Sequence, residues 1–204
     1  MKVFNYFNKF SLIAFFSIGV LVTGCKDDDV PDEENELEVI TDVKLIFTND
    51  ADATDVVEAS AQDPDGEGVE EPEILGEITL DADKTYTLTY EIFNNLESPG
   101  EDIGAEIQEE DDDHRLFYSF TANAFANPTG DGNIDSASDP INYNDNDGNG
   151  NSLGLSTSWT TSSTTISGGT FAVRLQHQPD VKTASSGATD GDTDFDLQFV
   201  LNIQ

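Results

Sequence analysis

The chain of 204 residues has one cysteine, two histidines and one tryptophan, and it has only eight basic residues compared with 42 acidic ones. A single cysteine has no partner within the chain, which excludes an intramolecular disulfide. The shortage of lysine and arginine argues against nucleic-acid binding, because so acidic a surface repels a phosphate backbone. We therefore expect cations as small partners and no nucleic acid.

Only one long apolar run occurs, from Phe10 to Val22 (FSLIAFFSIGVLV), and it follows two lysines. Its length is typical of the hydrophobic region of a secretory signal peptide and is too short for a bilayer-spanning helix. The residues from Leu21 to Cys25 resemble the lipobox at which lipoprotein signal peptides are cleaved. We therefore expect residues 1–24 to be a lipoprotein signal peptide and Cys25 to be the lipidated residue.

Directly behind Cys25 stand one lysine and three acids, Lys26, Asp27, Asp28 and Asp29. They resemble the export signal that directs Bacteroidetes-type lipoproteins to the cell surface, although an acidic run is also typical of an ordinary solvated tether. Residues 25–38 contain almost no apolar side chain, which predicts a flexible, lipidated tether. The expected location is the outer membrane, with the anchored domain facing the exterior.

Residues 39–204 predict a single domain in which apolar and polar residues alternate. Alternation with period two describes strands that bury one face. It is clear in five segments, 39–47, 86–92, 116–120, 171–175 and 195–203, and weaker in three others, 56–61, 76–80 and 153–160.

Turn-forming Asp, Gly, Asn and Ser residues separate these segments. Seven or eight such strands predict an all-β fold, an antiparallel immunoglobulin-like β-sandwich. One short helix is expected near residues 101–110, where Ile103 and Ile107 can share one helix face. Trp159 alternates with Ser and Thr, and we expect it in the core rather than on a carbohydrate-stacking surface.

The run DNDGNG places Asp145, Asp147 and Asn149 in the pattern of the first half of an EF-hand calcium loop. Alternating oxygen-bearing side chains around a glycine turn can converge on one Ca²⁺ ion. The second half of the pattern does not match, because Ser156 stands where a bidentate glutamate is expected. A solvated turn is the alternative interpretation of the same residues.

The two histidines, His114 and His177, each stand at the end of a predicted strand. If these strands are neighbours, the two imidazoles can meet beside an acid of the run 109–113. Two histidines and one carboxylate would form a site for a transition metal. The alternative is that both histidines form ordinary hydrogen bonds at the rim of the sheet.

Four runs lie in the C-terminal two thirds of the chain: Glu109 to Phe117 (EEDDDHRLF), Asp145 to Leu155 (DNDGNGNSLGL), Thr170 to Pro179 (TFAVRLQHQP) and Asp192 to Gln204 (DTDFDLQFVLNIQ). These runs resemble a family of small flavobacterial, Bacteroidetes-type surface lipoproteins with a β-rich domain. The resemblance implies a lipidated cysteine followed by acids. It implies no catalytic residue, since the family has no established activity.

These features together predict an outer-membrane lipoprotein with a non-catalytic β-sandwich binding domain and calcium as its candidate cofactor. Its expected partners are the membrane, through lipid on Cys25, and an extracellular protein or glycan. The sequence offers no free cysteine and no G-x-S-x-G nucleophile. Two alternatives remain open: a metal-dependent extracellular hydrolase that uses His114 and His177, and a structural spacer whose charge keeps the cell surface hydrated.

Overall fold

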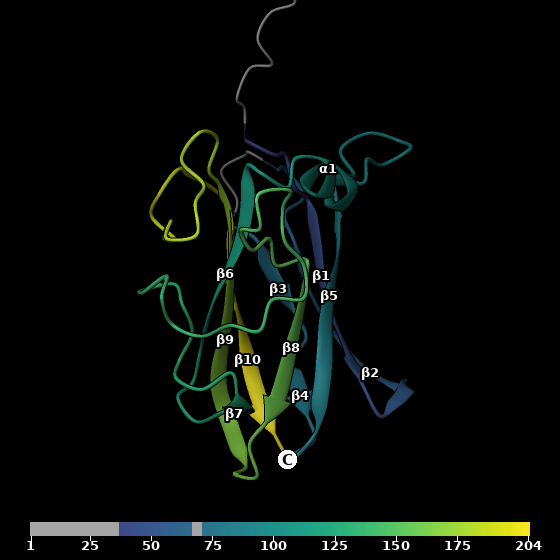
Figure 1. Ribbon diagram of the computed structural model, residues 1–204. Helices are drawn as coiled ribbons and strands as arrows, with labels where there is room; N and C mark the ends of the chain where they lie inside the picture. The colour runs from purple at the N-terminus through teal and green to yellow at the C-terminus, as the bar shows by residue number, and fades with distance from the viewer. Residues whose placement is uncertain (1–36, 67–70) are drawn as a thin grey trace, which may run out of the picture. The chain divides into compact units, whose positions relative to one another are not determined.

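The strands of the protein form two sheets that pack face to face (Figure 1). The computed structural model describes residues 37–66 and 71–204, so the predicted signal peptide, Cys25 and the run Lys26 to Asp29 lie outside the described residues. The described part is one compact unit, and none of its helices has the length and hydropathy needed to cross a membrane. The predicted all-β, sandwich-like fold is confirmed.

The larger sheet has six strands in the order β3-β2-β1-β5-β8-β7, and all its neighbouring strands are antiparallel. In β1, Val43, Leu45 and Phe47 are buried, because side chains of one parity share one face of a strand. The strands of this sheet are β1 (Asp42–Asn49), β2 (Asp52–Gln62), β3 (Glu73–Leu75), β5 (Thr85–Phe93), β7 (Phe125–Asn127) and β8 (Ser156–Thr161).

The smaller sheet has four strands in the order β4-β10-β9-β6. Its strands are β4 (Ile78–Leu80), β6 (His114–Phe120), β9 (Ile166–His177) and β10 (Asp192–Ile203). The pairing of β10 with β4 is parallel, which departs from the expected antiparallel pattern, and the other two pairings are antiparallel. Seven of the ten described strands have six or more residues, whereas β3, β4 and β7 have three each; of these short strands, alternation in the sequence indicated only β4, within the weaker segment 76–80.

Aromatic side chains fill the space between the two sheets. Trp159 of β8 is fully buried, as expected for a core residue, and its indole Nε1 donates a hydrogen bond to Thr157 Oγ1 at 2.7 Å. The ring centroids of four neighbours lie 4.9–5.4 Å from that of Trp159; they belong to Tyr118, Phe120, Phe125 and Phe171. This packing leaves the ends of the sandwich, rather than its interior, for polar side chains.

The helix α1 (Ile103–Glu109) lies beside β5, and the predicted short helix is confirmed. Asp102 caps its first turn, since the carboxylate accepts a hydrogen bond from the backbone N–H of Ala105 at 3.2 Å. Ile103 and Ile107 are both buried, as their spacing predicts. The helix thus closes one corner of the hydrophobic core.

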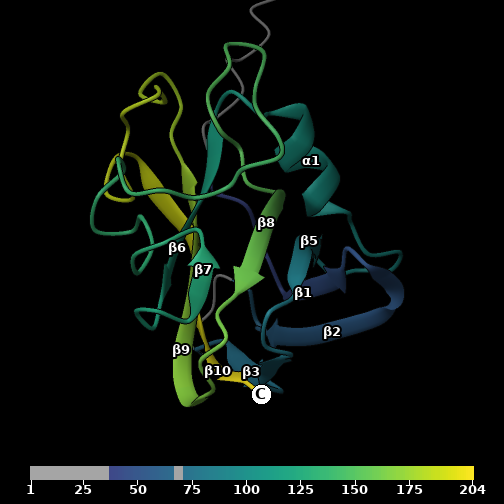
Figure 2. The same ribbon diagram turned by 60° about the horizontal axis from the view of Figure 1, so that its bottom comes forward.

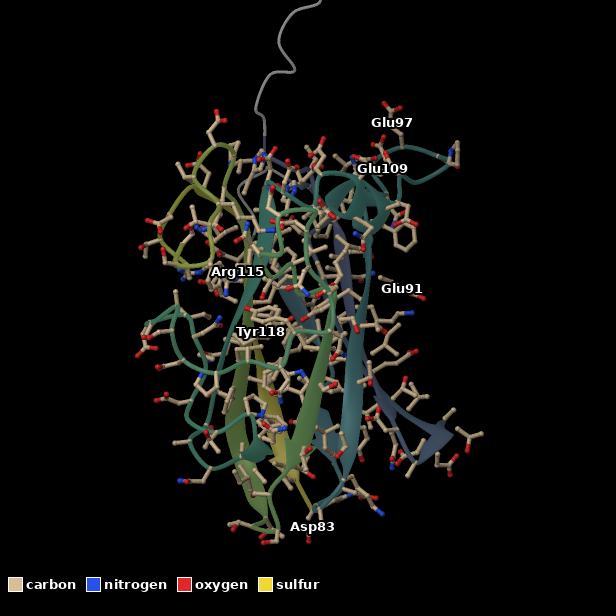
Figure 3. All side chains as sticks on the ribbon, in the orientation of Figure 1. Asp83, Glu91, Glu97, Glu109, Arg115 and Tyr118 are labelled. Atoms are coloured by element: carbon tan, nitrogen blue, oxygen red, sulfur yellow. The ribbon has the colours of Figure 1, made fainter. Side chains whose placement is uncertain are left out.

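One end of the sandwich gathers α1 and the loops 144–153 and 178–191, and the C-terminus lies at the other end (Figures 1 and 2). We call the first of these the polar end. In Figure 3, Glu109 marks the polar end and Asp83 the opposite one. Residue Glu38 joins the sandwich at the polar end, where its backbone N–H donates a hydrogen bond to Asp194 Oδ1 at 3.2 Å.

Candidate functional site

The two histidines of the chain meet at the polar end. His114 begins β6 and His177 ends β9, and the antiparallel register places the two residues directly opposite each other. Their imidazole rings are stacked, with centroids 4.6 Å apart and an angle of 4° between the planes. The side chain of His114 is fully buried, and His177 is buried at the rim.

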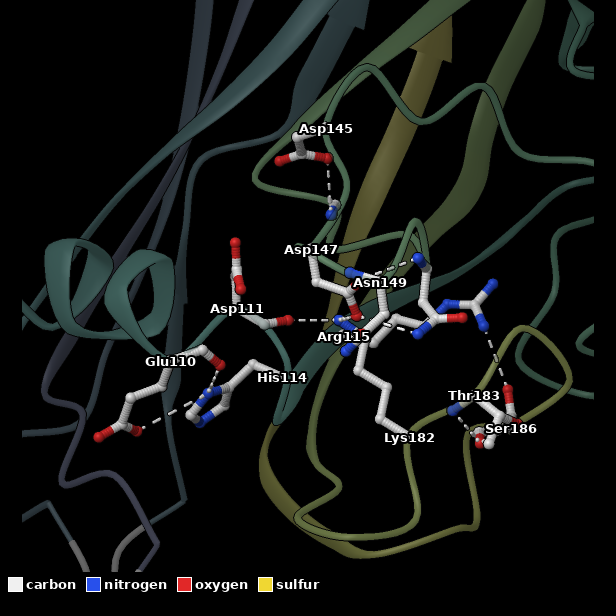
Figure 4. A network of polar contacts seen from close by, with 12 residues as sticks. Glu110, Asp111, His114, Arg115, Asp145, Asp147, Asn149, Lys182, Thr183 and Ser186 are labelled. Atoms are coloured by element: carbon white, nitrogen blue, oxygen red, sulfur yellow. Dashed lines mark hydrogen bonds and ion pairs between the residues drawn. The ribbon is translucent and has the colours of Figure 1, made fainter.

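Glu110, which follows α1, is the acid beside His114 (Figure 4). Its carboxylate Oε2 lies 4.0 Å from His114 Nδ1, and ligand atoms of Glu110, His114 and His177 all lie within 4.8 Å of one another. The backbone carbonyl oxygen of Glu110 lies 3.2 Å from His114 Nδ1. A carbonyl can only accept, so in the neutral imidazole Nδ1 carries the hydrogen and Nε2 carries a free lone pair.

Asp194 of β10 completes the cluster from the other side of His114. Its Oδ2 atom lies 3.9 Å from His114 Nε2, and both side chains are fully buried. Neither atom has a hydrogen-bond partner within the described part of the chain. Glu38 and Asp194 also line an open cavity of ≈ 470 Å³. The site therefore contains two buried polar atoms that face each other at a distance too long for a direct hydrogen bond.

The sequence pattern did not reveal Asp194. Its parity in the run DTDFDLQF places it on the polar face of β10, together with the exposed Asp196. The pairing of β10 with β9 has a register shift between Thr193 and Phe195, which is the geometry of a β-bulge. A bulge redirects the side chain of the extra residue, so it provides a reason why Asp194 turns inward.

Burial sets the protonation of this cluster. It raises the pKa of Asp194 to about 7, an effect that the nearby carboxylate of Glu38 increases and the hydrogen bond from the Glu38 N–H opposes. Burial also raises the pKa of Glu38 to about 7, with a further contribution from Glu106. For His114 burial lowers the pKa to about 4, and the neighbouring His177 adds to this effect. At neutral pH the buried imidazole is therefore uncharged.

The predicted calcium loop lies beside the histidine cluster. The Asp145 carboxylate accepts hydrogen bonds from the backbone N–H groups of Gly154 and Ser156 at 2.8 and 2.9 Å. The Asp147 carboxylate accepts two further backbone bonds, both of 2.8 Å, from Asn149 and Asn151. Asn149 therefore takes part in this loop through its backbone N–H, which donates a hydrogen bond to Asp147.

The ammonium of Lys182 lies beside Asp147, where the loop pattern predicts a bound cation (Figure 4). Lys182 Nζ lies 3.2 Å from Asp147 Oδ2, and the two side chains are 1% and 0% exposed. The ammonium also donates a hydrogen bond to the backbone carbonyl of Asp111. Calcium binding by this loop remains a prediction, and the ion would have to compete with Lys182 for Asp147.

Arg115 is a second buried cation at the polar end. Its guanidinium carbon lies 4.8 Å from the ring centroid of Phe117 and 5.3 Å from that of Tyr143. Its Nη1 donates a hydrogen bond of 3.3 Å to the backbone carbonyl of Ser186. Arg115 therefore ties the loop 178–191 to β6, and cation–π contacts replace part of its hydration.

Comparisons of the chain with protein-family models, with curated proteins and with solved structures found no match. Membership of the flavobacterial lipoprotein family therefore stays a prediction.

Proposed function

We propose that the chain is an exported outer-membrane lipoprotein whose β-sandwich is a non-catalytic binding domain with its ligand site at the polar end. One observation carries the proposal: the only cysteine, Cys25, stands directly behind the only long apolar run of the chain. That arrangement is typical of a lipid anchor that replaces a membrane-spanning helix. The acids that follow Cys25 favour a surface-exposed position.

The placing of the ligand site is supported by the distribution of side chains. The interior of the sandwich is filled by aromatic and aliphatic residues, so its middle offers little room for a ligand. By contrast, the polar end brings two histidines and several carboxylates together next to an open cavity. Convergent polar groups beside a cavity are typical of binding sites.

A metal-dependent hydrolase is the second candidate, and the grouping of Glu110, His114 and His177 favours it. A catalytic metal must keep one coordination position open for water or substrate. The complete burial of His114 is less suited to that requirement than to binding alone. Wild-type protein loaded with Zn²⁺ should therefore hydrolyse no ester, phosphoester or peptide substrate; turnover that is lost in His177→Ala would instead support the hydrolase.

The lipid anchor is tested with a Cys25→Ser variant of the full-length chain in a bacterium that processes lipoproteins. The wild type should incorporate a labelled fatty acid and enter the detergent phase, whereas Cys25→Ser should do neither. An unlabelled wild type would overturn the anchor. Protease treatment of intact cells then tests exposure: alanine substitution of the run Lys26 to Asp29 should protect the domain while leaving lipidation unchanged.

A further inference from the structure

We propose that the polar end binds one divalent transition-metal ion of the zinc class between His114 Nε2 and Asp194 Oδ2, with His177 as the third protein ligand. This inference rests on the proposed binding domain, because it names the ligand of the same site. It does not depend on the lipid anchor, so the experiments on Cys25 leave it untouched.

The two facing atoms are the first argument. His114 Nε2 and Asp194 Oδ2 are both buried, and neither has a hydrogen-bond partner among the described residues. Because Nδ1 of His114 faces the carbonyl of Glu110, Nε2 presents a lone pair, and the ionised carboxylate of Asp194 presents another. Two buried acceptors that face each other need a hydrogen-bond donor or a cation between them. A metal ion satisfies both at once.

The distance between the atoms is the second argument. A shared hydrogen would draw a nitrogen and an oxygen to about 2.9 Å, whereas these atoms lie 3.9 Å apart. Typical bonds from zinc are about 2.0 Å to a histidine nitrogen and about 2.1 Å to a carboxylate oxygen. In a tetrahedral site these lengths place the two ligand atoms about 3.4 Å apart, so an ion would draw the two side chains together by about 0.5 Å.

The hydrogen bond between His114 Nδ1 and the Glu110 carbonyl is the third argument. Histidines that bind metals commonly donate their second N–H to a carbonyl or a carboxylate, which fixes the tautomer and the ring orientation. In this site the Glu110 carbonyl has that position, at 3.2 Å, and the Glu110 carboxylate lies near the same nitrogen. We therefore assign Glu110 an orienting role rather than a place among the metal ligands.

His177 requires a larger movement than the other two ligands. The lone pairs of imidazole nitrogens lie in the ring plane, so the nearly parallel rings of His114 and His177 do not aim at a common point. A rotation of the His177 side chain, which lies at the end of β9, would turn one nitrogen toward the ion. Glu38, which lines the adjoining cavity with Asp194, is available for the fourth position.

The donor set selects the class of metal. Imidazole nitrogen favours zinc and similar transition metals, whereas Ca²⁺ and Mg²⁺ prefer sites made of oxygen atoms. The surrounding carboxylates of Glu38, Glu110 and Asp192 add negative potential that attracts a cation. The nearby ammonium of Lys182 opposes this attraction only weakly, since Asp147 pairs with it at 3.2 Å.

The test uses the full-length protein in detergent after removal of metals by a chelator. Calorimetric titration with Zn²⁺ should give one saturable site, and Co²⁺ should produce visible absorption of a low-symmetry site with nitrogen and oxygen ligands. Asp194→Asn should weaken Zn²⁺ binding at least tenfold. Asp192→Asn is the matched control, because it removes the same charge from an exposed residue of the same strand that offers no ligand atom, so it should weaken Zn²⁺ binding far less than Asp194→Asn does.

Two further variants separate the possible outcomes. His114→Ala should abolish binding, and His177→Ala should weaken it and change the Co²⁺ spectrum; thermal melting of each variant verifies that it is folded. The inference is overturned if Zn²⁺ gives no saturable response, or if Asp194→Asn binds like the wild type while Glu110→Gln does not. If the protein binds no metal ion but binds a glycan or a protein at the polar end, the metal site is overturned and the proposed binding function is retained.

Discussion

The ammonium of Lys182 lies 3.2 Å from Oδ2 of Asp147, and both side chains are shielded from solvent. Replacing Lys182 by alanine leaves a buried carboxylate without its counter-ion, so we expect Lys182→Ala to lower the free energy of unfolding by about 3 kcal/mol. Urea denaturation measures this change. Lys44→Ala is the control, since the Lys44–Glu91 pair is exposed to water and its loss should have little effect. Equal effects of the two substitutions would contradict a stabilising role for the buried pair.

The same variant tests the predicted calcium loop. With the ammonium removed, the carboxylate of Asp147 becomes available to another cation, so Ca²⁺ should raise the melting temperature of Lys182→Ala more than that of the wild type. A ligand that binds only the folded state stabilises it in this way. The additional substitution Asp145→Ala should reduce the response if Asp145 shares the ion. Equal Ca²⁺ responses of wild type and Lys182→Ala would show that Lys182 does not compete with the ion.

The buried carboxyl of Asp194 should make stability depend on pH. Its pKa is about 7 in the folded protein against an ordinary value of 3.8, so between these values the folded state holds more protons than the unfolded state. The free energy of unfolding should therefore fall as pH rises from 4 to 7, by up to about 4 kcal/mol from this group. His114, whose pKa is lowered to about 4, acts in the opposite direction.

Asp194→Asn isolates the contribution of this carboxyl. The amide cannot ionise and can donate a hydrogen bond to His114 Nε2, so we expect the variant to be more stable than the wild type at pH 8 without metal. The difference in melting temperature between the two proteins should grow from pH 4 to pH 8, measured in chelator. A difference that stays constant with pH would mean that Asp194 titrates in its ordinary range.

Trp159→Ala should remove the centre of the aromatic core. The indole is fully buried among four other rings, and the vacated space cannot collapse completely. Substitutions of this kind typically cost about 3 to 5 kcal/mol. Urea denaturation of Trp159→Ala should show a loss in this range, whereas Leu96→Ala, which alters a side chain that is 51% exposed, should remain close to the wild type. Retained stability in Trp159→Ala would favour a surface role for the indole.

Gly191 holds the turn between the loop 178–191 and β10. Its φ angle is +80°, and an added Cβ atom would lie 2.0 Å from the backbone carbonyl oxygen of His177. Gly191→Ala should therefore cost about 2 kcal/mol or more in stability and displace His177. Gly187→Ala is the matched control within the same loop, because its Cβ atom would meet only Asp190 Oδ2, at 3.9 Å. Similar melting temperatures for the two variants would argue against this strain.

The sequence predicted the strands and the helix whose buried side chains recur at a regular spacing along the chain. Alternation identified the long strands, and the spacing of Ile103 and Ile107 identified α1, because both signals follow from the geometry of a single element. Local pattern carries no information on which strands are neighbours, so the pairing of His114 with His177 could only be stated conditionally. The side-by-side position of β6 and β9 fulfils that condition.

The remaining site residues depend on features that local pattern does not encode. The inward position of Asp194 coincides with a register shift in β10, and the partnership of Lys182 with Asp147 joins two loops that are distant in the sequence. One compositional signal was available: only six basic residues follow Cys25, and Arg115 and Lys182 are two of them. Because basic residues are so rare in this acidic chain, each one is a reasonable candidate for a buried ion pair.

The parallel pairing of β10 with β4 has a consequence for the order of folding. It joins Leu201 to Ile78, and β4 has no other neighbour in the smaller sheet. The second layer of the sandwich therefore cannot close while β10 is still being synthesised, and pairings so distant along the chain form slowly. For a chain exported as we propose, this delay would keep the polypeptide extended during translocation across the inner membrane, and the domain would fold only after it has crossed.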